Sequence, residues 1–414
     1  MNKTENARAL VPNLRFPEFQ ETNGWSLSLL GNVCDMQAGK FVAAAEISLQ
    51  SGVDLFPCYG GNGLRGYTKT HTHSGRYSLI GRQGSLCGNV TLVDGRFHAT
   101  EHAVVATPKT GIHTEWLFHE LGLLNLNRFA TGQALPGLSV EVLNRVECAI
   151  PKDEAEQKKI ADCLSSLDYL IHLEAEKLDS IKTHKKGLMQ QLFPAENEKL
   201  PSLRFPEFLD ANKWDEKVLG PMTLKIGSGI TPTGGDKNYK TAGRPFVRSQ
   251  NVGWGELILN DVVFIDEGTH QSFDSTEICA NDVLLNITGA SIGRSATADS
   301  RVVGGNVNQH VCIIRTKPNE LNHTLLNQFL ISERGQKQID SFQAGGNRQG
   351  LNFAQIRSFL IPLPPTETEQ KAIANCLSSL DELIAAQAQK LDTLKTHKKG
   401  LMQQLFPQVE EADA

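Results

Sequence analysis

The sequence predicts an α+β protein in which two α/β-type variable domains are separated by two long helices packed as an antiparallel coiled coil. This fold has a pseudo-twofold internal repeat, and two observations predict it. The twelve residues Thr183–Pro194 return unchanged as Thr396–Pro407, and such repeats define the architecture of a chain. Leu14–Phe19 likewise returns as Leu203–Phe208, whereas the material between the repeated blocks shows almost no similarity. The repeated blocks therefore form a frame that is present twice, and each copy of the frame encloses a different variable segment.

The repeats divide the chain of 414 residues, which is longer than a single typical core allows. We predict a first variable domain over 1–154, a first repeated helix over 155–194, a second variable domain over 195–365, a second repeated helix over 366–407 and an acidic tail over 408–414.

The two variable domains contain short apolar runs followed by glycines. Leu79–Gly84 and Val283–Gly289 indicate buried strands that lead into tight turns. Around them lie side chains suited to base edges, because Arg and Lys bind guanine and Asn and Gln bind adenine through paired hydrogen bonds. Asn, Gly and Thr also make turns, and for any one residue a turn role is favoured over base reading, so the prediction depends on the group as a whole. The candidates for DNA contact are Asn62, Arg65, Lys69, Arg82, Gln83, Asn89, Thr231, Lys237, Arg248, Asn251, Asn286, Arg294, Asn308, Gln309 and Arg348.

Each repeated helix carries apolar residues that step by four and three along the chain. This heptad spacing predicts a narrow seam that packs on another helix. Polar residues interrupt the seam at matching places, Glu174 with Lys185 and Gln387 with Lys398, where they would fix register. Alternatively, each helix covers the core of its own domain. The predicted seam consists of Ile160, Leu164, Leu167, Ile171, Leu178, Ile181, Leu188, Ile373, Leu377, Leu380, Ile384, Leu391, Leu394 and Leu401.

The charge of the chain argues against a self-sufficient nucleic-acid binder. Its net charge is −5, whereas affinity for DNA comes largely from Lys and Arg contacts to phosphate. Binding would need a local basic surface or a basic partner. The cluster His184–Lys186 is either a phosphate contact or a solvated helix face.

Several classes of protein are disfavoured. No apolar run approaches the roughly 20 residues that cross a bilayer, and no signal peptide is apparent, so we expect a cytoplasmic protein with no membrane contact. The eight cysteines lie far apart without zinc-binding spacing, so no metal site is expected. Phosphate-loop, dinucleotide-binding and hydrolase motifs are also missing, and we predict no catalytic residues.

The chain resembles the specificity subunit of type I restriction–modification systems, close to the type IC subgroup. The repeated segments that start at Gln157 and Gln370 within the predicted helices, with their shared ending His-Lys-Lys-Gly-Leu-Met-Gln-Gln-Leu-Phe-Pro, carry the resemblance, together with the paired Leu-Arg-Phe-Pro-Glu-Phe segments. The variable domains add Tyr59–Gly63, Asp282–Arg294 and Asn306–His310.

This resemblance implies that each variable domain is a target recognition domain that binds one half of a bipartite site in double-stranded DNA. The helices would set the spacer between the half-sites and dock two methyltransferase subunits, with motor–nuclease subunits added for cleavage. The chain itself would be non-catalytic and hold no cofactor, since S-adenosylmethionine, ATP and magnesium would be used by the partners. Other classes remain open: a helical adaptor without DNA binding, a self-sufficient methyltransferase or nuclease, and an orphan specificity subunit that acts only in methylation.

Overall fold

The computed structural model describes residues 10–84, 86–132, 136–343 and 350–407. Within it the chain forms two compact units. The first comprises residues 1–175 and 390–414, and the second comprises 176–389. Each unit therefore holds one variable segment together with part of each long helix.

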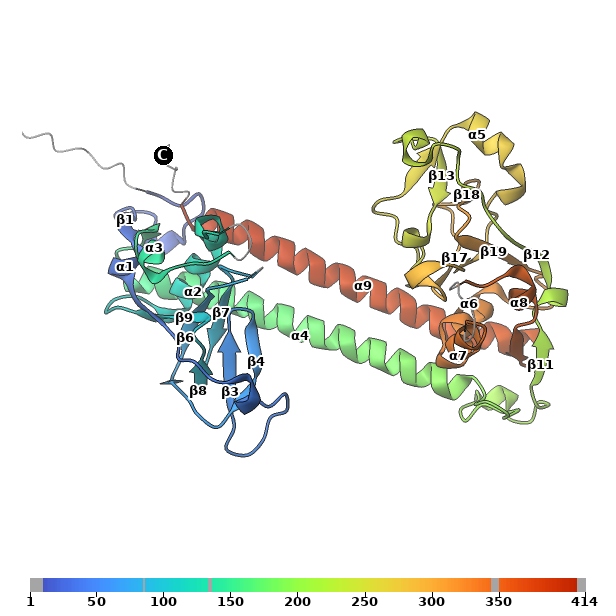
Figure 1. Ribbon diagram of the computed structural model, residues 1–414, viewed down its shortest axis with the longest axis horizontal. Helices are drawn as coiled ribbons and strands as arrows, with labels where there is room; N and C mark the ends of the chain where they lie inside the picture. Colours follow the sequence, from blue (N-terminus) through green and yellow to red (C-terminus); the bar gives the residue numbers. More distant parts are fainter. Residues whose placement is uncertain (1–9, 85, 133–135, 344–349, 408–414) are drawn as a thin grey trace, which may run out of the picture. The chain divides into compact units, whose positions relative to one another are not determined.

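The two long helices, α4 and α9, have the same length. They span Glu154–Leu192 and Glu367–Leu405, 39 residues each (Figure 1). Both begin with two glutamates in the first turn, where negative charge is favoured by the helix dipole. Both end shortly before a proline, Pro194 or Pro407, and proline disfavours helix in the residue before it. The helices predicted from the heptad spacing are thus confirmed as elements.

The first unit contains two four-stranded sheets, ordered β2-β9-β6-β7 and β4-β3-β8-β5. Helix α2 packs on the first of these sheets (Figure 1). The predicted buried strand at Leu79 is β6, whose last four residues are all buried. The elements are β1 Ser26–Leu29, α1 Leu30–Val33, β2 Cys34–Ala38, β3 Phe56–Gly60, β4 Gly63–Thr68, β5 His73–Ser74, β6 Tyr77–Gly81, β7 Val90–Val93, β8 Arg96–Ala99, β9 Ala103–Pro108, α2 Thr114–Leu123, α3 Val140–Asn144 and β10 Glu147–Ile150.

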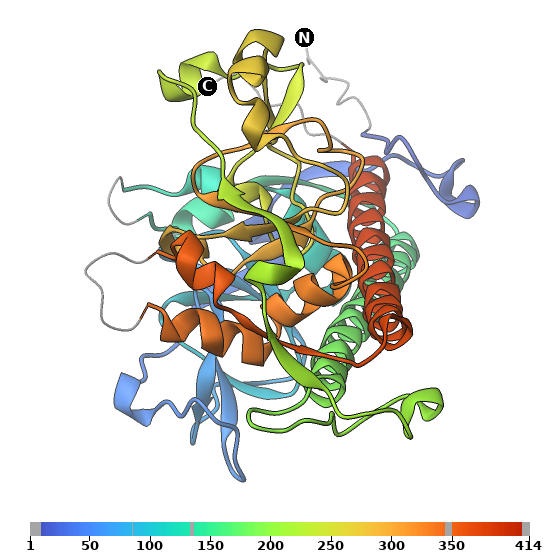
Figure 2. The ribbon, with the colours of Figure 1, turned by 90° about the vertical axis from the view of Figure 1, so that its right-hand side faces the viewer.

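The second unit follows the same plan with a five-stranded sheet, β12-β19-β16-β17-β14, and a three-stranded sheet, β15-β13-β18. Figures 1 and 2 show α5 and the three-stranded sheet at the end of this unit farthest from its α4 segment. The predicted strand at Val283 is β16, which is buried throughout. The elements are β11 Asp215–Val218, β12 Thr223–Ser228, β13 Arg244–Val247, β14 Trp254–Gly255, β15 Val263–Ile265, α5 Glu267–Ser272, β16 Val283–Asn286, β17 Ser295–Thr297, β18 Asn306–Val307, β19 Val311–Thr316, α6 His323–Ile331, α7 Glu333–Ser341, α8 Phe353–Arg357 and β20 Leu360–Leu363.

Each variable domain is joined to the frame by a pair of antiparallel strands. Strand β1 pairs with β10 in the first unit and β11 pairs with β20 in the second. The chain therefore enters and leaves each domain at neighbouring positions. Such an arrangement lets the contents of the domain vary without moving the frame.

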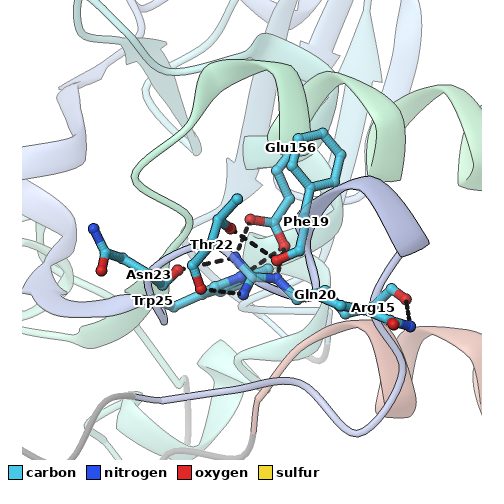
Figure 3. A network of polar contacts seen from close by, with 7 residues as sticks. All are labelled: Arg15, Phe19, Gln20, Thr22, Asn23, Trp25 and Glu156. Carbon is cyan, nitrogen blue, oxygen red and sulfur yellow. Dashed lines mark hydrogen bonds and ion pairs between the residues drawn. The ribbon is translucent and has the colours of Figure 1, made fainter.

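In each unit a buried ion pair, which we call the clamp, joins the segment before the strand pair to the first turn of the long helix that follows it. In the first unit Arg15 donates to both carboxylate oxygens of Glu156, each at 2.7 Å, and the Trp25 indole N–H donates to Glu156 Oε1 at 3.1 Å (Figure 3). Arg204, Trp214 and Glu369 repeat the same contacts in the second unit. The clamp explains why the Leu-Arg-Phe-Pro-Glu-Phe segment is present twice: its arginine binds the first turn of each long helix.

The ends of the long helices belong to the cores of the units. In the first unit Ile160 and Leu164 of α4 lie in one apolar cluster with Leu405 of α9. In the second, Leu192 and Ile373 share a cluster with the domain residues. The alternative that each helix covers the core of its own domain is therefore correct at the N-terminal end of each helix, whereas the C-terminal end belongs to the core that contains the other domain.

The two helices run antiparallel within each unit. In the first, Lys398 binds Asp168 at 2.5 Å and Lys390 binds Glu174 at 2.5 Å, so the residue number rises along one helix as it falls along the other. In the second, Lys185 binds Asp381 at 2.6 Å. Asp168 and Asp381 are repeat-equivalent, as are Lys185 and Lys398. The seam residues on both helices are buried or half-buried.

Candidate nucleic-acid interface

The hairpin of β3 and β4 presents three of the predicted DNA-contacting residues of the first unit. Asn62 lies in the turn, Arg65 on β4 and Lys69 just after it, and all three are exposed. Because they are exposed, these three side chains are not enclosed by the rest of the domain, and Arg65 and Lys69 carry positive charge. Exposed cationic and polar side chains of this kind can contact phosphates and bases, so DNA contact by these three residues stays a prediction.

A second group of predicted residues lies in the loop between β6 and β7. Gln83 and Asn89 are exposed, whereas Arg82 is half-buried and its Nε donates to the Leu138 carbonyl at 3.2 Å. The β3–β4 turn packs against this loop: a Cβ added to Gly61 would lie 3.1 Å from the Gln83 carbonyl oxygen. The structure thus brings Asn62 and Gln83 to one end of the first unit, although the sequence separates them.

In the second unit the polar candidates that reach the surface come from three segments. Lys237 and Gln309 are exposed, and Thr231 and Arg294 are half-buried. The Thr231 hydroxyl donates to the side-chain oxygen of Gln309, which joins the segment after β12 to the loop before β19. Thr231 and Gln309 therefore form one polar surface.

Three predicted contacts in the second unit are buried in this structure. Asn251 is fully buried, and its amide donates to Asp261 and to the Ile258 carbonyl. Asn286 is fully buried and donates to the Ser249 carbonyl. Asn308 is 7% exposed. Buried amides with partners inside the domain hold it together, but the buried Asn286 Oδ1 has no partner among the described residues. A base contact by these three residues would require them to become exposed, and it stays a prediction.

Two further predicted residues have different outcomes. The guanidinium of Arg248 donates to the Asp261 carbonyl at 2.6 Å and lies over the Tyr239 ring, 5.5 Å from its centroid. A base contact by Arg248 would therefore compete with these partners and stays a prediction. Arg348 lies outside the described residues.

Two histidines, one in each unit, occupy corresponding positions that the sequence did not connect. The His102 carbonyl accepts from the N–H of Arg82, which directly follows the buried strand β6. The His310 carbonyl accepts from the N–H of Ile287, which directly follows the buried strand β16. His102 Nε2 lies 3.1 Å from Glu101, and His310 contacts Thr288 and Gln309. Their only shared sequence signal is a polar tripeptide before an apolar strand, Thr-Glu-His or Asn-Gln-His.

The middle lysine of the basic cluster has a different role from either one expected, whereas His184 and Lys186 are exposed. Lys185 is 7% exposed and ion-paired with Asp381, so it is neither a phosphate contact nor a solvated side chain. Within the described residues, no group of three His, Cys, Asp or Glu side chains could hold a metal ion. Over the same residues, no helix is both long and apolar enough to cross a membrane.

Comparison with known proteins places this architecture in a family. The model of the type I restriction modification DNA specificity domain matches the chain twice, over residues 22–183 and 227–396. Together these matches cover most of the chain and end at equivalent threonines of the repeat. The chain therefore belongs to the type I restriction modification DNA specificity family.

Individual relatives are similar to this chain over only part of its length or at low identity. The specificity subunit of the type I restriction enzyme EcoprrI from Escherichia coli is 44% identical over 142 residues, which span 34% of this chain and only 35% of that protein. The MjaVIII specificity subunit of Methanocaldococcus jannaschii is 25% identical over 70% of this chain and 69% of its own length.

Two solved structures share the fold. The S subunit of a type I system from M. genitalium has a TM-score of 0.69, with 16% identity, over 97% of this chain and 100% of its own. A chain from a structure that describes assembly of a type I system has a TM-score of 0.52, also with 16% identity, over 93% of this chain and 98% of its own. At this identity the likeness supports the fold alone.

Proposed function

We propose that this chain is the non-catalytic DNA-recognition subunit of a type I restriction–modification complex, with each variable domain reading one half of a bipartite site. One observation carries the proposal: two different domains are attached to one duplicated frame by identical devices, a strand pair and a buried clamp. A frame that is kept while its contents change suits a protein that must meet the same partners and read two different sequences.

The surfaces available for reading DNA differ between the domains. The first offers the β3–β4 hairpin with Arg65 and Lys69, and the second offers Lys237 and the Thr231–Gln309 surface. Side chains of these types discriminate bases in the major groove through paired hydrogen bonds. Different residues at the two surfaces would give two unrelated half-sites.

The Lys and Arg side chains of this chain alone would provide little affinity for DNA. In the second unit, Arg244, Arg301, Arg315 and Arg334 are each ion-paired with a neighbouring carboxylate. Because non-specific affinity for DNA follows the number of phosphates neutralised, we infer that the methyltransferase partners supply many of the phosphate contacts. S-adenosylmethionine, and the ATP and magnesium used for cleavage, would belong to the methyltransferase and motor–nuclease subunits.

The proposal is tested by co-expression of the chain with a type I methyltransferase subunit from the same source, followed by single-molecule mapping of methylated adenines. We expect one two-part motif with a fixed gap. Replacing residues 26–150, between the first clamp tryptophan and the end of β10, with the corresponding segment of another specificity subunit should change one half of the motif only. A well-formed complex that methylates no bipartite motif would refute DNA recognition and favour the adaptor alternative.

We further propose that the paired helices set the gap between the half-sites. A helix of 39 residues is about 58 Å long at 1.5 Å per residue, enough to span one DNA turn of about 34 Å. A seven-residue insertion between Leu167 and Lys185, matched by one between Leu380 and Lys398, preserves the seam and adds about 10 Å. The mapped gap should then grow by about three base pairs with both half-sites unchanged. Altered half-sites with an unchanged gap would refute this role.

A further inference from the structure

A three-residue turn is built in the same way in both variable domains. It comprises Thr100–His102 directly before β9 in the first unit and Asn308–His310 directly before β19 in the second. In each turn the side-chain oxygen of the first residue accepts the backbone N–H of the histidine, at 3.4 Å in the first unit and 3.1 Å in the second. The N–H of that first residue donates to the neighbouring sheet, at the carbonyl of Tyr59 or of Val247. The two turns therefore hold their middle residues at corresponding places.

The middle residue is Glu101 in the first unit and Gln309 in the second, two side chains of the same shape with different hydrogen-bonding capacity. Gln309 is exposed. Glu101 is half-buried, and its Oε2 is enclosed without a hydrogen-bond partner among the described residues. Of the two, Gln309 is therefore the better placed to meet a ligand at the surface.

The side-chain amide of Gln309 is held at both of its polar atoms. The Thr231 hydroxyl donates to Oε1, and Nε2 lies 3.0 Å from Nε2 of His310. Because an amide nitrogen can only donate, this ring nitrogen of His310 is the acceptor, and the ring proton is on Nδ1, which contacts the Thr288 hydroxyl. Thr231, His310 and Thr288 are all half-buried, so the exposed amide is fixed to the body of the domain.

Fixing an exposed glutamine does little for the stability of the fold. A long side chain loses rotamer freedom when it is held in one position, and hydrogen bonds that replace contacts with water contribute only modestly. The same contacts do lower the entropic cost of binding a ligand, because the side chain is already ordered before the ligand arrives. The arrangement around Gln309 is therefore suited to recognition.

The two contacts leave the amide with one acceptor and one donor. Oε1 has two lone pairs and Nε2 has two hydrogens, and Thr231 and His310 use one of each. A ligand that binds the remaining pair must offer a donor beside an acceptor. In the major groove adenine has this pattern, with the N6 amino group beside N7, whereas guanine offers two acceptors, O6 and N7, and would leave Oε1 without a donor.

We propose that Gln309 recognises an adenine in the half-site of the second domain, with Oε1 accepting from N6 and Nε2 donating to N7, and that Thr231 and His310 are positioning residues for this contact. This inference rests on the proposed function. An adenine bound in this way stays within the duplex, so it is not the methylated base, which is flipped out of the helix. The second half-site should therefore contain an A·T pair besides the methylated one.

Base analogues in the mapped half-site test the contact. The chain assembled with its methyltransferase subunits is titrated with duplexes in which one adenine at a time is replaced by 7-deazaadenine, which lacks the N7 acceptor, or by purine, which lacks the N6 amino group. At one unmethylated position both analogues should weaken binding, and a wrong base should weaken it about 5- to 150-fold. Gln309→Leu should bind adenine and both analogues equally at this position. The base preferences of the first half-site should stay unchanged.

Gln309→Glu tests the chemistry with a side chain of the same shape. A carboxylate only accepts, and it binds the amino group of cytosine rather than the edge of adenine. The first unit already holds a glutamate in this turn, with Glu101 Oε1 3.1 Å from Nε2 of His102, so the variant should fold with an unchanged unfolding midpoint. Its preference at the same position should change from adenine to cytosine.

Thr231 and His310 offer matched variants for the positioning role. Thr231→Val keeps the shape of the side chain but removes the hydroxyl, and it should reduce the discrimination for adenine about 2- to 10-fold. Thr231→Ser keeps the hydroxyl and should discriminate like the wild type. His310→Leu should act like Thr231→Val, whereas His310→Gln, which keeps an acceptor, should retain more of the discrimination. A purely structural role would weaken binding to every base alike and leave the ratio unchanged.

The outcomes separate this inference from the proposed function. If the map shows a bipartite motif whose second half has no unmethylated A·T pair, or if Gln309→Leu and Gln309→Glu keep the base preference of the wild type, Gln309 does not recognise adenine, while DNA recognition stands. If Thr231→Val and His310→Leu discriminate like the wild type, the positioning role is wrong. If no bipartite motif is found at all, the proposed function fails and this inference fails with it.

Discussion

Substitution of Glu156 by Gln should open the clamp of the first unit. Glu156 is 1% exposed and Arg15 is 6% exposed at the side chain, and Arg15 also donates to the carbonyls of Thr22 and Asn23 at 3.1 and 3.0 Å. The hydrogen bonds that Arg15 donates to Glu156 raise the pKa of the arginine, which is therefore always charged. Gln keeps the shape of the side chain but leaves a buried guanidinium without its counter-charge.

The loss expected from this geometry is large. Removal of one partner from a buried ion pair costs about 3–5 kcal/mol, and Gln retains one acceptor, so we expect about 3 kcal/mol. For a domain of this size each kcal/mol lowers the unfolding midpoint by about 2–4 °C, which gives about 6–12 °C. Glu369→Gln should have the same effect in the second unit, because Arg204 and Trp214 repeat the contacts.

The assay combines thermal unfolding with hydrogen exchange measured by mass spectrometry, which assigns the change to one unit. Protection of the β1–β10 strand pair should fall in Glu156→Gln, while that of β11–β20 stays unchanged. Asp162→Asn is the matched control: it breaks an exposed pair with Lys158 on the same helix, and such pairs contribute about 0–1 kcal/mol.

The double variant Arg15→Met with Glu156→Leu provides the decisive comparison. It leaves no buried charge, so it should be less destabilised than Glu156→Gln alone. A midpoint shift below about 2 °C for Glu156→Gln, or a double variant as unstable as the sum of the single variants, would show that the clamp does not hold the first domain to its helix.

Three further predictions concern other parts of the chain. Burial raises the pKa of Glu120 to about 8, so the folded state keeps a proton that the unfolded chain releases near pH 4.5. The first unit should therefore lose stability between about pH 5 and 8, and Glu120→Gln should remove this dependence in unfolding curves at the two pH values. Gly229→Ala should destabilise the second unit by about 1–3 kcal/mol or more, because its Cβ would lie 1.6 Å from the Val307 carbonyl oxygen; unchanged urea unfolding would contradict this. Arg65→Ala and Lys69→Ala should each weaken DNA binding by the assembled complex and lower the salt slope by about one, and an unchanged slope would exclude that residue from phosphate contact.

The long helices were predictable because their signals are local and repeated. The four–three spacing of apolar residues, glutamates in the first turn and a proline just beyond the end mark α4 and α9 without reference to distant residues. The buried strands β6 and β16 were predictable for a similar reason, since continuous apolar runs bounded by glycine have few other uses in a folded chain.

The candidate site was harder to predict because polar residues of one type serve different purposes. Asn62 is exposed in a turn, whereas Asn251 is fully buried and binds Asp261. The two residues look alike in sequence, and only the surrounding fold distinguishes them. The sequence placed Lys185 both in a basic cluster and at a polar position of the helix seam, and the contact with Asp381 of the other helix supports the seam position.

The sequence by itself determined that this protein is a frame present twice with two different domains, because a repeat can be recognised without knowing any contact. It also determined the family, whose model follows the same duplication. Only the tertiary structure decided what the repeated residues do: Arg15 reaches Glu156 across 141 positions, and Lys185 of one long helix binds Asp381 of the other. Such contacts depend on the path of the whole chain, since hydrogen bonds and ion pairs act over a few ångströms in space and leave no periodic signal along the sequence.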